Sequence, residues 1–130
     1  MTATYITRYG YSASVSDANQ EEVMSSLLAE LRDEKFDEPD DEHTQVSVGN
    51  EHWAVTAQVS GLITFDNIDL LEGVPSELPA SMYLRDVSDE TIKAIWRAVI
   101  GANEKVLLSF AWAPLGELNP YQKDYYRNAL

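Results

Sequence analysis

Apolar and polar side chains alternate along residues 45–59, in two runs that Gly49-Asn50 separates. The apolar positions of these runs are Val46, Val48, Trp53, Val55, Ala57 and Val59. Because successive side chains of a strand point to opposite faces of a sheet, this alternation predicts two strands with one apolar face. A Gly-Asn pair favours a tight turn, and a third run of the same kind, residues 62–65, follows Ser60-Gly61. The segment therefore predicts an antiparallel meander.

Two other segments carry apolar residues at helical spacing. In the first, Ser16 and Asp17 are expected to begin a helix, with Asp17 and Gln20 spaced as a capping box. Its apolar stripe consists of Val23, Met24, Leu27, Leu28 and Leu31. In the second, Ser88 is expected to be the N-cap and Gly101 to end the helix. Its stripe consists of Ile92, Ile95, Trp96, Val99 and Ile100, so both segments are predicted to be amphipathic helices.

Further strands are predicted on either side of these elements. Residues 3–9 and 11–15 are rich in Thr, Tyr, Ile and Val, and they predict one strand broken at Gly10 or a short hairpin. Residues 81–85 predict a short strand. Residues 106–112 are apolar on both faces, which predicts a strand at the centre of the sheet.

The order of these elements predicts the fold class. Residues 66–80 are expected to be a long connection, and Asn119-Pro120 is expected to start a short terminal helix. The fold class is therefore α+β: a mostly antiparallel sheet of five to six strands packed with two amphipathic helices, with a short C-terminal helix. The sequence contains no internal repeat and no linker, so residues 1–130 are predicted to form a single domain.

The balance of charge restricts the kind of partner. Asp and Glu number 22 against nine Lys and Arg, which gives a formal net charge of −13 at pH 7. A field of this sign repels nucleic acid and anionic lipid and accelerates association with a basic partner. The basic residues form no stripe that could bind phosphates. We therefore expect neither a nucleic-acid nor a membrane partner, while a surface that is acidic only for solubility stays an open alternative.

The sequence also indicates a compartment. There is no cysteine, which excludes disulfides, thiol nucleophiles and cysteine zinc sites and suits a reducing compartment. The first eight residues lack the basic and apolar regions of a secretory signal, and no apolar run approaches the roughly 20 residues that span a bilayer. We therefore expect a cytoplasmic protein.

Two groups of side chains are the candidate partner-binding residues. Residues 33–42 hold seven carboxylates and no apolar periodicity, so we expect an exposed acidic loop that is either merely solvated or docks a basic partner. Three tyrosines near the end of the chain lie beside Lys123 and Arg127 and either bind a partner or dock on the sheet. The candidate partner-binding residues are Asp37, Glu38, Asp40, Asp41, Glu42, Tyr121, Tyr125 and Tyr126.

No motif of the common enzyme classes is present: the sequence has no phosphate-binding glycine loop and no nucleophile elbow. His43 and His52, with carboxylates of residues 40–42, could hold a divalent metal, but surface histidines at strand ends are far commoner. The loop 33–42 lacks the central glycine of a calcium-binding loop. We therefore predict no catalytic residue, no metal and no cofactor. The following aromatic residues are assigned to the core: Trp53, Trp96, Phe110 and Trp112.

One stretch has the shape of a known family. It runs from residues 82–86 through the helix that Ser88 begins, the turn at residues 101–103 and an expected strand that ends at Trp112. This order resembles the C-terminal half of small α+β immunity proteins from bacterial polymorphic-toxin and contact-dependent inhibition systems. The opening strand, followed by residues 17–22 and a leucine-rich helix, is also similar to these proteins. The resemblance implies a cognate toxin as the partner and a mode of action that occludes the toxin.

These observations lead to one preferred function and two alternatives. The preferred function is an acidic immunity protein that neutralises a cognate basic toxin, such as a nuclease, by direct binding. The first alternative is another acidic inhibitor or a nucleic-acid mimic of phage origin. The second is a small ligand-binding domain or enzyme of unfamiliar type. A contiguous acidic patch favours the preferred function, and a deep pocket with a titratable residue favours the second alternative.

Overall fold

The computed structural model describes residues 3–32 and 44–114, which form six strands and four helices. In chain order these are β1 (Ala3–Ile6), β2 (Ser12–Val15), α1 (Gln20–Leu31), β3 (Gln45–Gly49), β4 (Trp53–Gln58), β5 (Leu62–Asn67), α2 (Ile68–Leu71), β6 (Ser81–Arg85), α3 (Asp89–Ile100) and α4 (Glu104–Leu107). The predicted α+β fold class is confirmed, and so are the meander of β3, β4 and β5 and the strand at residues 81–85. The helix expected after Asn119-Pro120 lies outside the described residues.

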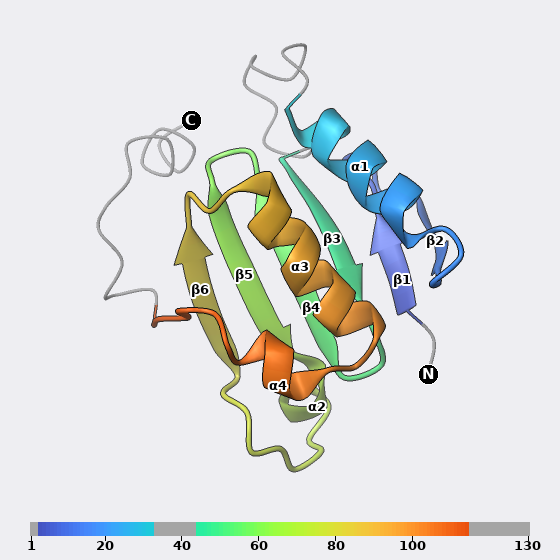
Figure 1. Cartoon of the computed structure of the whole chain (residues 1–130). Coiled ribbons are helices and arrows are strands. Elements are labelled where there is room, and N and C mark those ends of the chain that lie inside the picture. Colours follow the sequence, from blue (N-terminus) through green and yellow to red (C-terminus); the bar gives the residue numbers. More distant parts are fainter. Residues whose placement is uncertain (1–2, 33–43, 115–130) are drawn as a thin grey trace.

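The strands form one sheet in the order β2-β1-β3-β4-β5-β6. Every neighbouring pair of strands is antiparallel. The segment around Gly10 is a hairpin, because β1 pairs with β2 from Ala3 opposite Val15 to Ile6 opposite Ser12. The two long helices, α1 and α3, lie on the same face of this sheet (Figure 1). The molecule therefore has a helical layer on a sheet layer.

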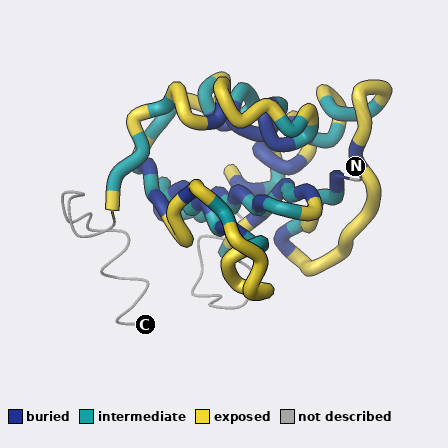
Figure 2. The backbone as a smooth tube through the Cα atoms, turned by 90° about the horizontal axis from the view of Figure 1, so that it is seen from below, coloured by how far each residue is buried: buried dark blue, intermediate teal, exposed yellow. Residues whose placement is uncertain are grey.

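The core lies between these two layers, where Figure 2 shows most of the buried residues. The alternation predicted for β3 and β4 is observed, because Val46, Val48, Val55 and Ala57 are buried while their neighbours are partly exposed or exposed. Trp96 of α3 is fully buried, and its Nε1 donates a hydrogen bond to the carbonyl oxygen of Val55 at 3.1 Å. A buried indole needs such an acceptor, so this bond sets how α3 sits over β4.

The two long helices begin differently. In α3 the Ser88 side chain accepts a hydrogen bond from the Thr91 backbone N–H, as predicted for its N-cap. The capping box predicted from Asp17 and Gln20 is wrong, since α1 begins at Gln20 and its N-cap, Asn19, makes no side-chain cap. The Asn19 Oδ1 instead accepts from the Ser16 backbone N–H at 2.7 Å. That bond closes a turn before the helix and occupies the group that would have capped it.

Ion pairs join the ends of the antiparallel helices α1 and α3. Arg97 lies 2.7 Å from Glu21, and Arg32 lies 2.8 Å from Asp89. All four side chains are substantially exposed to solvent, so each pair contributes at most about 1 kcal/mol. The buried apolar faces therefore hold the helices in place, and the ion pairs contribute to their orientation.

The central strand predicted for residues 106–112 is wrong. This segment contains the end of α4 and an irregular stretch, followed by an isolated bridge between Ala113 and Tyr83 at the outer side of β6. Its residues are apolar because Leu107 is buried and because the Trp112 ring lies 6.0 Å from the ring of Phe65. A short apolar run packed over a sheet has the same periodicity as a buried strand within it, so the pattern could not distinguish the two.

The assignment of the aromatic residues to the core is confirmed. Trp53 and Trp96 are buried, and Phe110 and Trp112 pack against the core while partly buried. In the described ranges, no helix is both long enough and apolar enough to cross a membrane.

Candidate functional site

The candidate partner-binding residues from the sequence lie outside the described residues. These are Asp37, Glu38, Asp40, Asp41, Glu42, Tyr121, Tyr125 and Tyr126. His43 lies outside them too, whereas His52 is described. Within residues 3–32 and 44–114 there is no group of three or more His, Asp or Glu side chains that could hold a metal ion.

Exposed apolar side chains gather at one end of the sheet. Of the eight large hydrophobic residues that are exposed in the described ranges, five lie on or next to α2 and α4: Leu70, Leu71, Val74, Val106 and Leu108. Both helices lie at the end of the sheet where β3 turns into β4 (Figure 1). Leu71 is 75% exposed. Single exposed leucines are normal, but five exposed apolar side chains at one end of the sheet make this end a candidate interaction surface.

Exposed carboxylates surround the same end. They come from the β3–β4 turn, from the connection after α2 and from the first residue of α4: Glu51, Glu72, Glu77 and Glu104. None of the four forms an ion pair with another described residue, whereas Arg32, Lys93 and Arg97 are paired on the helical layer. We call these four carboxylates and the five apolar side chains the turn-end surface.

His52 and Asp69 hold α2 against the β3–β4 turn. The His52 Nδ1 lies 2.8 Å from the Asp69 Oδ1 and 3.0 Å from its Oδ2. The Ile68 backbone N–H donates to the carbonyl oxygen of His52 at 2.8 Å. A helix of four residues has little stability of its own, so these two contacts position the apolar side chains that follow.

The connection after α2 is held by a buried asparagine. The Asn67 Nδ2 donates to the Ser76 Oγ at 2.9 Å and to the carbonyl oxygen of Leu78 at 3.1 Å. Leu78 itself is buried. The connection, which carries Glu72 and Glu77, is therefore bonded to the end of β5.

A hydrogen bond attaches the β3–β4 turn to the end of α3. Asn50 is buried, and its Nδ2 donates to the carbonyl oxygen of Val99 at 2.8 Å. Its Oδ1 accepts from the backbone N–H groups of His52 at 2.7 Å and Trp53 at 2.9 Å. One side chain thus connects the turn to α3, and α4 follows α3 directly. Hydrogen bonds therefore join the β3–β4 turn both to α2 and to the end of α3, which α4 follows.

The pKa of His52 is raised above its ordinary value, first because its ring hydrogen-bonds the Asp69 carboxylate and further because Asp69 and Glu51 are negatively charged. Desolvation acts in the opposite direction; it is smaller than the effect of the hydrogen bond but larger than the effect of either charge. Protonated His52 donates to Asp69, so the arrangement fits a charge-assisted contact that stabilises α2. No hydroxyl group of the described residues hydrogen-bonds the other ring nitrogen.

Sequence reasoning missed this surface. The pattern of residues 66–80 predicts a connection and that of residues 106–112 a buried strand, and neither pattern indicates a binding surface. One signal was available, since Leu70 and Leu71 lie between Asp69 and Glu72 without the apolar periodicity of a core element.

Comparison of the chain with family models, with curated proteins and with solved structures found no match.

Proposed function

We propose that this chain is a protein-binding domain that neutralises a basic protein, in the manner of an immunity protein, and that it acts in the cytoplasm. The turn-end surface carries this proposal, because it combines exposed apolar side chains with carboxylates that lack an ion pair among the described residues. A cognate toxin, such as a nuclease, is the partner proposed.

The two kinds of side chain have different tasks in such a complex. Burying one exposed leucine at an interface stabilises the complex by roughly 1.5–3 kcal/mol before ordering costs. Exposed carboxylates at a rim contribute less to affinity and more to the association rate. Leu71, at 75% exposed, is therefore the proposed apolar contact, and Glu72 and Glu104 attract the basic partner.

The resemblance to immunity proteins contributes less to this proposal than the surface does. It included a strand that ends at Trp112, and that segment contains α4 instead. The agreement that is left covers β6, the Ser88 cap and α3, together with the opening strand β1 and the leucine-rich helix α1. All of these are common elements of α+β domains. The chemistry of the turn-end surface is thus the main support.

The first experiment is affinity capture of the full chain from its native cells at low ionic strength, followed by a salt wash. We expect one stoichiometric basic protein that is toxic when expressed alone and is silenced by co-expression of this chain. Recovery of nothing, or of a mixture that salt removes, would contradict the proposal. A captured protein that DNA displaces would instead indicate a nucleic-acid mimic.

Two matched triple variants then locate the surface on the captured partner. E72Q/E77Q/E104Q removes three carboxylates from the turn-end surface, and D17N/E22Q/E90Q removes the same charge elsewhere. We expect the first to slow association at low salt by roughly tenfold and the second to change it much less. Equal effects of the two triple variants would show that net charge alone attracts the partner. The apolar variant L71S should accelerate dissociation without lowering the stability of the free protein.

A further inference from the structure

The two outer strands of the sheet, β2 and β6, differ in how their edges are covered (Figure 1). At β6, the Tyr83 backbone N–H donates to the Ala113 carbonyl oxygen at 2.8 Å, and the Ala113 N–H donates back at 2.9 Å. At the other edge, no described strand pairs with the outer side of β2, and its residues 12–14 are all exposed. An unpaired edge of this kind is a template for pairing with another strand.

The register of the hairpin shows which backbone groups of β2 face outward. The Thr7 N–H donates to the Tyr11 carbonyl oxygen at 2.8 Å. Because hydrogen-bonded pairs alternate with other pairs in antiparallel strands, the N–H and C=O groups of Ser12 and Ser14 point away from β1. The Asn19 Nδ2 donates to the Ser14 carbonyl oxygen at 3.3 Å. The outward groups of Ser12 have no such partner among the described residues.

The residues of this edge do not oppose pairing. Charged side chains and prolines commonly protect sheet edges, and Ser12–Val15 contains neither. Tyr11, which directly precedes β2, is 74% exposed, and Ala13 on the same face of the strand is exposed as well. The edge therefore combines unpaired backbone groups with an aromatic side chain that can cover a small neighbour.

Carboxylates are absent from this part of the chain. Of the 22 Asp and Glu residues, none precedes Asp17, and residues 1–16 are the longest stretch of the sequence without one. The one charged side chain in that stretch is Arg8, which is buried and donates to the carbonyl oxygens of Glu30 and Leu31. A second molecule with a net charge of −13 therefore meets less repulsion at this edge than at carboxylate-bearing surfaces.

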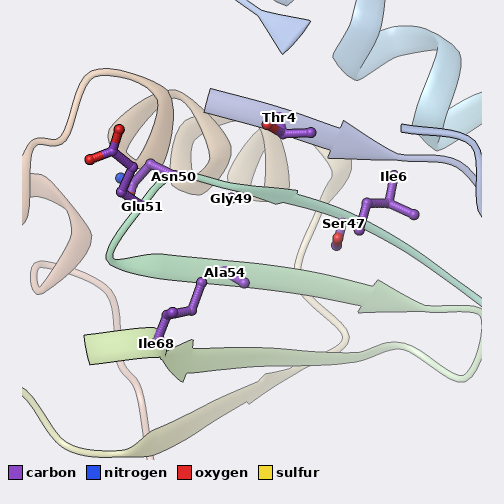
Figure 3. A pocket seen from close by; sticks show the side chains of 8 residues that line it. All are labelled: Thr4, Ile6, Ser47, Gly49, Asn50, Glu51, Ala54 and Ile68. Atoms are coloured by element: carbon purple, nitrogen blue, oxygen red, sulfur yellow. The ribbon is translucent and has the colours of Figure 1, made fainter. Parts of the chain in front are cut away.

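The open face of the sheet beside this edge is also poor in charge. A pocket of about 310 Å³ lies there, between β1, β3, β4 and the start of α2 (Figure 3). Its row of small residues follows from the register, because Thr4 lies opposite Gly49 and Gly49 lies opposite Ala54. Glu51 is the one charged residue of the lining, and Figure 3 shows it at the β3–β4 turn, at the far end from Ile6. The pocket thus brings no carboxylate to the strand next to β2.

We propose that β2 is a dimerisation edge, at which the β2 strands of two copies of this chain pair antiparallel about a two-fold axis. The axis passes through Ser12, and its outward N–H and C=O groups bond those of Ser12 in the second copy. In this register, Tyr11 of each copy lies opposite Ala13 of the other, so an exposed ring covers an exposed small residue. The two Tyr11 rings are diagonal neighbours across the axis, within reach of each other.

The neighbouring register fits less well. With the axis at Ala13, Tyr11 would lie opposite Val15, which is already buried and has little surface to offer. That register would also use the Ser14 carbonyl oxygen, to which Asn19 already donates. The axis at Ser12 avoids both costs.

A second copy matches this edge better than the basic partner does. Carboxylates attract a basic protein, and this hairpin has none. The inference goes beyond the proposed function and leaves the turn-end surface uncovered, because α2 and α4 lie away from β2 (Figure 1). Since the interface is small, we expect a weak dimer with a dissociation constant on the order of 10–100 µM.

The test is analytical ultracentrifugation of the full chain from about 10 µM to about 1 mM, which spans the expected dissociation constant. We expect a reversible monomer–dimer equilibrium that shifts towards the dimer as salt is added, because screening weakens the repulsion between two acidic copies. Amide hydrogen exchange then locates the interface. The Ser12 N–H should exchange more slowly at the high protein concentration than at the low one.

Two variants act on the edge in different ways. S12P removes the outward N–H and keeps the hydrogen bonds between β1 and β2, since proline is tolerated on edge strands. A13E places a carboxylate opposite Tyr11 of the second copy. Each should weaken dimerisation by roughly tenfold or more, whereas A80E adds the same charge at an exposed alanine before β6 and should change it much less. The amide spectrum of each variant checks that its fold is retained.

Four results would overturn the proposal: a monomer at every concentration and salt, a species larger than a dimer, a dimer unchanged in S12P and A13E, or equal losses in A13E and A80E. A chain that is monomeric alone, but whose Ser12 amide is protected by a captured partner, would assign the edge to a strand of that partner instead. The dimer is measured on the chain alone, so its failure and the failure of the proposed function are distinguishable.

Discussion

Asn50 donates a hydrogen bond from its Nδ2 to the carbonyl oxygen of Val99 at 2.8 Å, across 49 positions of sequence. This contact joins the β3–β4 turn to the last turn of α3. The same side chain accepts from the backbone N–H groups of His52 and Trp53, so it determines the shape of the turn as well as its position. The turn-end surface depends on this support, because both α2 and α3 are bonded to the turn.

We expect N50A to lower the free energy of unfolding by about 2–3 kcal/mol, because it leaves buried backbone groups without their partners. The measurement is urea denaturation of the full chain. N103A is the matched control, since Asn103 caps α4 from an exposed position and should cost about 1 kcal/mol. If N103A proved as costly as N50A, the Asn50 bonds would not be the support of the turn.

The contact between His52 and Asp69 makes stability depend on pH. The pKa of His52 is raised in the folded chain, so protonated His52 contributes stability that is complete below the unfolded pKa of about 6.5. That contribution is lost as pH rises through the higher pKa of the folded protein. We expect H52Q to be less stable than the unmodified chain between about pH 5 and pH 6.5 and equally stable at high pH.

The pKa itself can be measured from the His52 ring signals. D69N should lower it towards the ordinary value, because the hydrogen bond to the Asp69 carboxylate is the largest cause of the shift. An unchanged pKa in D69N would contradict the assignment of the cause. A constant stability difference between H52Q and the unmodified chain at all pH values would show that packing, and not charge, is lost.

Gly61 and Asp86 approach each other at the turn between β4 and β5. Gly61 has a φ of +97°, and a Cβ atom there would overlap the Asp86 Oδ1. We expect G61A to lower the free energy of unfolding by about 2–3 kcal/mol, from backbone strain and from this overlap together. Gly10 is the matched control, because its φ is +87° and no atom lies within 4 Å of an added Cβ.

G10A should therefore cost about 1 kcal/mol, from backbone strain alone. The double variant G61A/D86A should recover part of the loss in G61A, since the overlapping carboxylate is gone. Equal losses in G10A and G61A, measured by urea denaturation, would show that the Asp86 side chain moves aside at no cost.

The ion pair between Glu21 and Arg97 should contribute little to stability. Their side chains are 62% and 40% exposed, so solvent screens the attraction. A double-mutant cycle with E21Q and R97Q should give a coupling energy of at most about 0.5–1 kcal/mol, which decreases with added salt. A coupling well above that range would mean that the ion pairs, and not the apolar faces, hold α1 against α3.

Much of the fold could be predicted because its information is local. Apolar and polar side chains alternate along β3, β4 and β5, and this alternation indicates which face of each strand is buried. The apolar stripe of α3 indicates which side of that helix faces the core. The Ser88 cap is likewise a contact between neighbours in sequence. These features depend on side-chain direction within one element, which the chain itself dictates.

The errors occurred where a local pattern allowed two solutions. The helix begins at Gln20 and not after Asp17, and the Asn19 side chain accepts from the Ser16 backbone N–H in a turn before the helix, so no capping box forms. Residues 106–112 were apolar enough for a strand, yet Leu107 and Trp112 bury that surface from α4 and an irregular segment. A strand and a helix followed by an irregular segment would bury the same side chains of residues 106–112. Which of the two forms depends on the position of β6 at the edge of the sheet.

The sequence by itself determined the layers of this protein, its strand pattern and its negative charge. Only the tertiary structure decided that Asn50 reaches Val99, that His52 meets Asp69, and that Thr4, Gly49 and Ala54 align into a pocket. These residues are polar or small, and the hydrophobic periodicity of the sequence does not mark them. Their roles arise from contacts between elements far apart in sequence, which become defined only when the core has fixed the elements relative to one another.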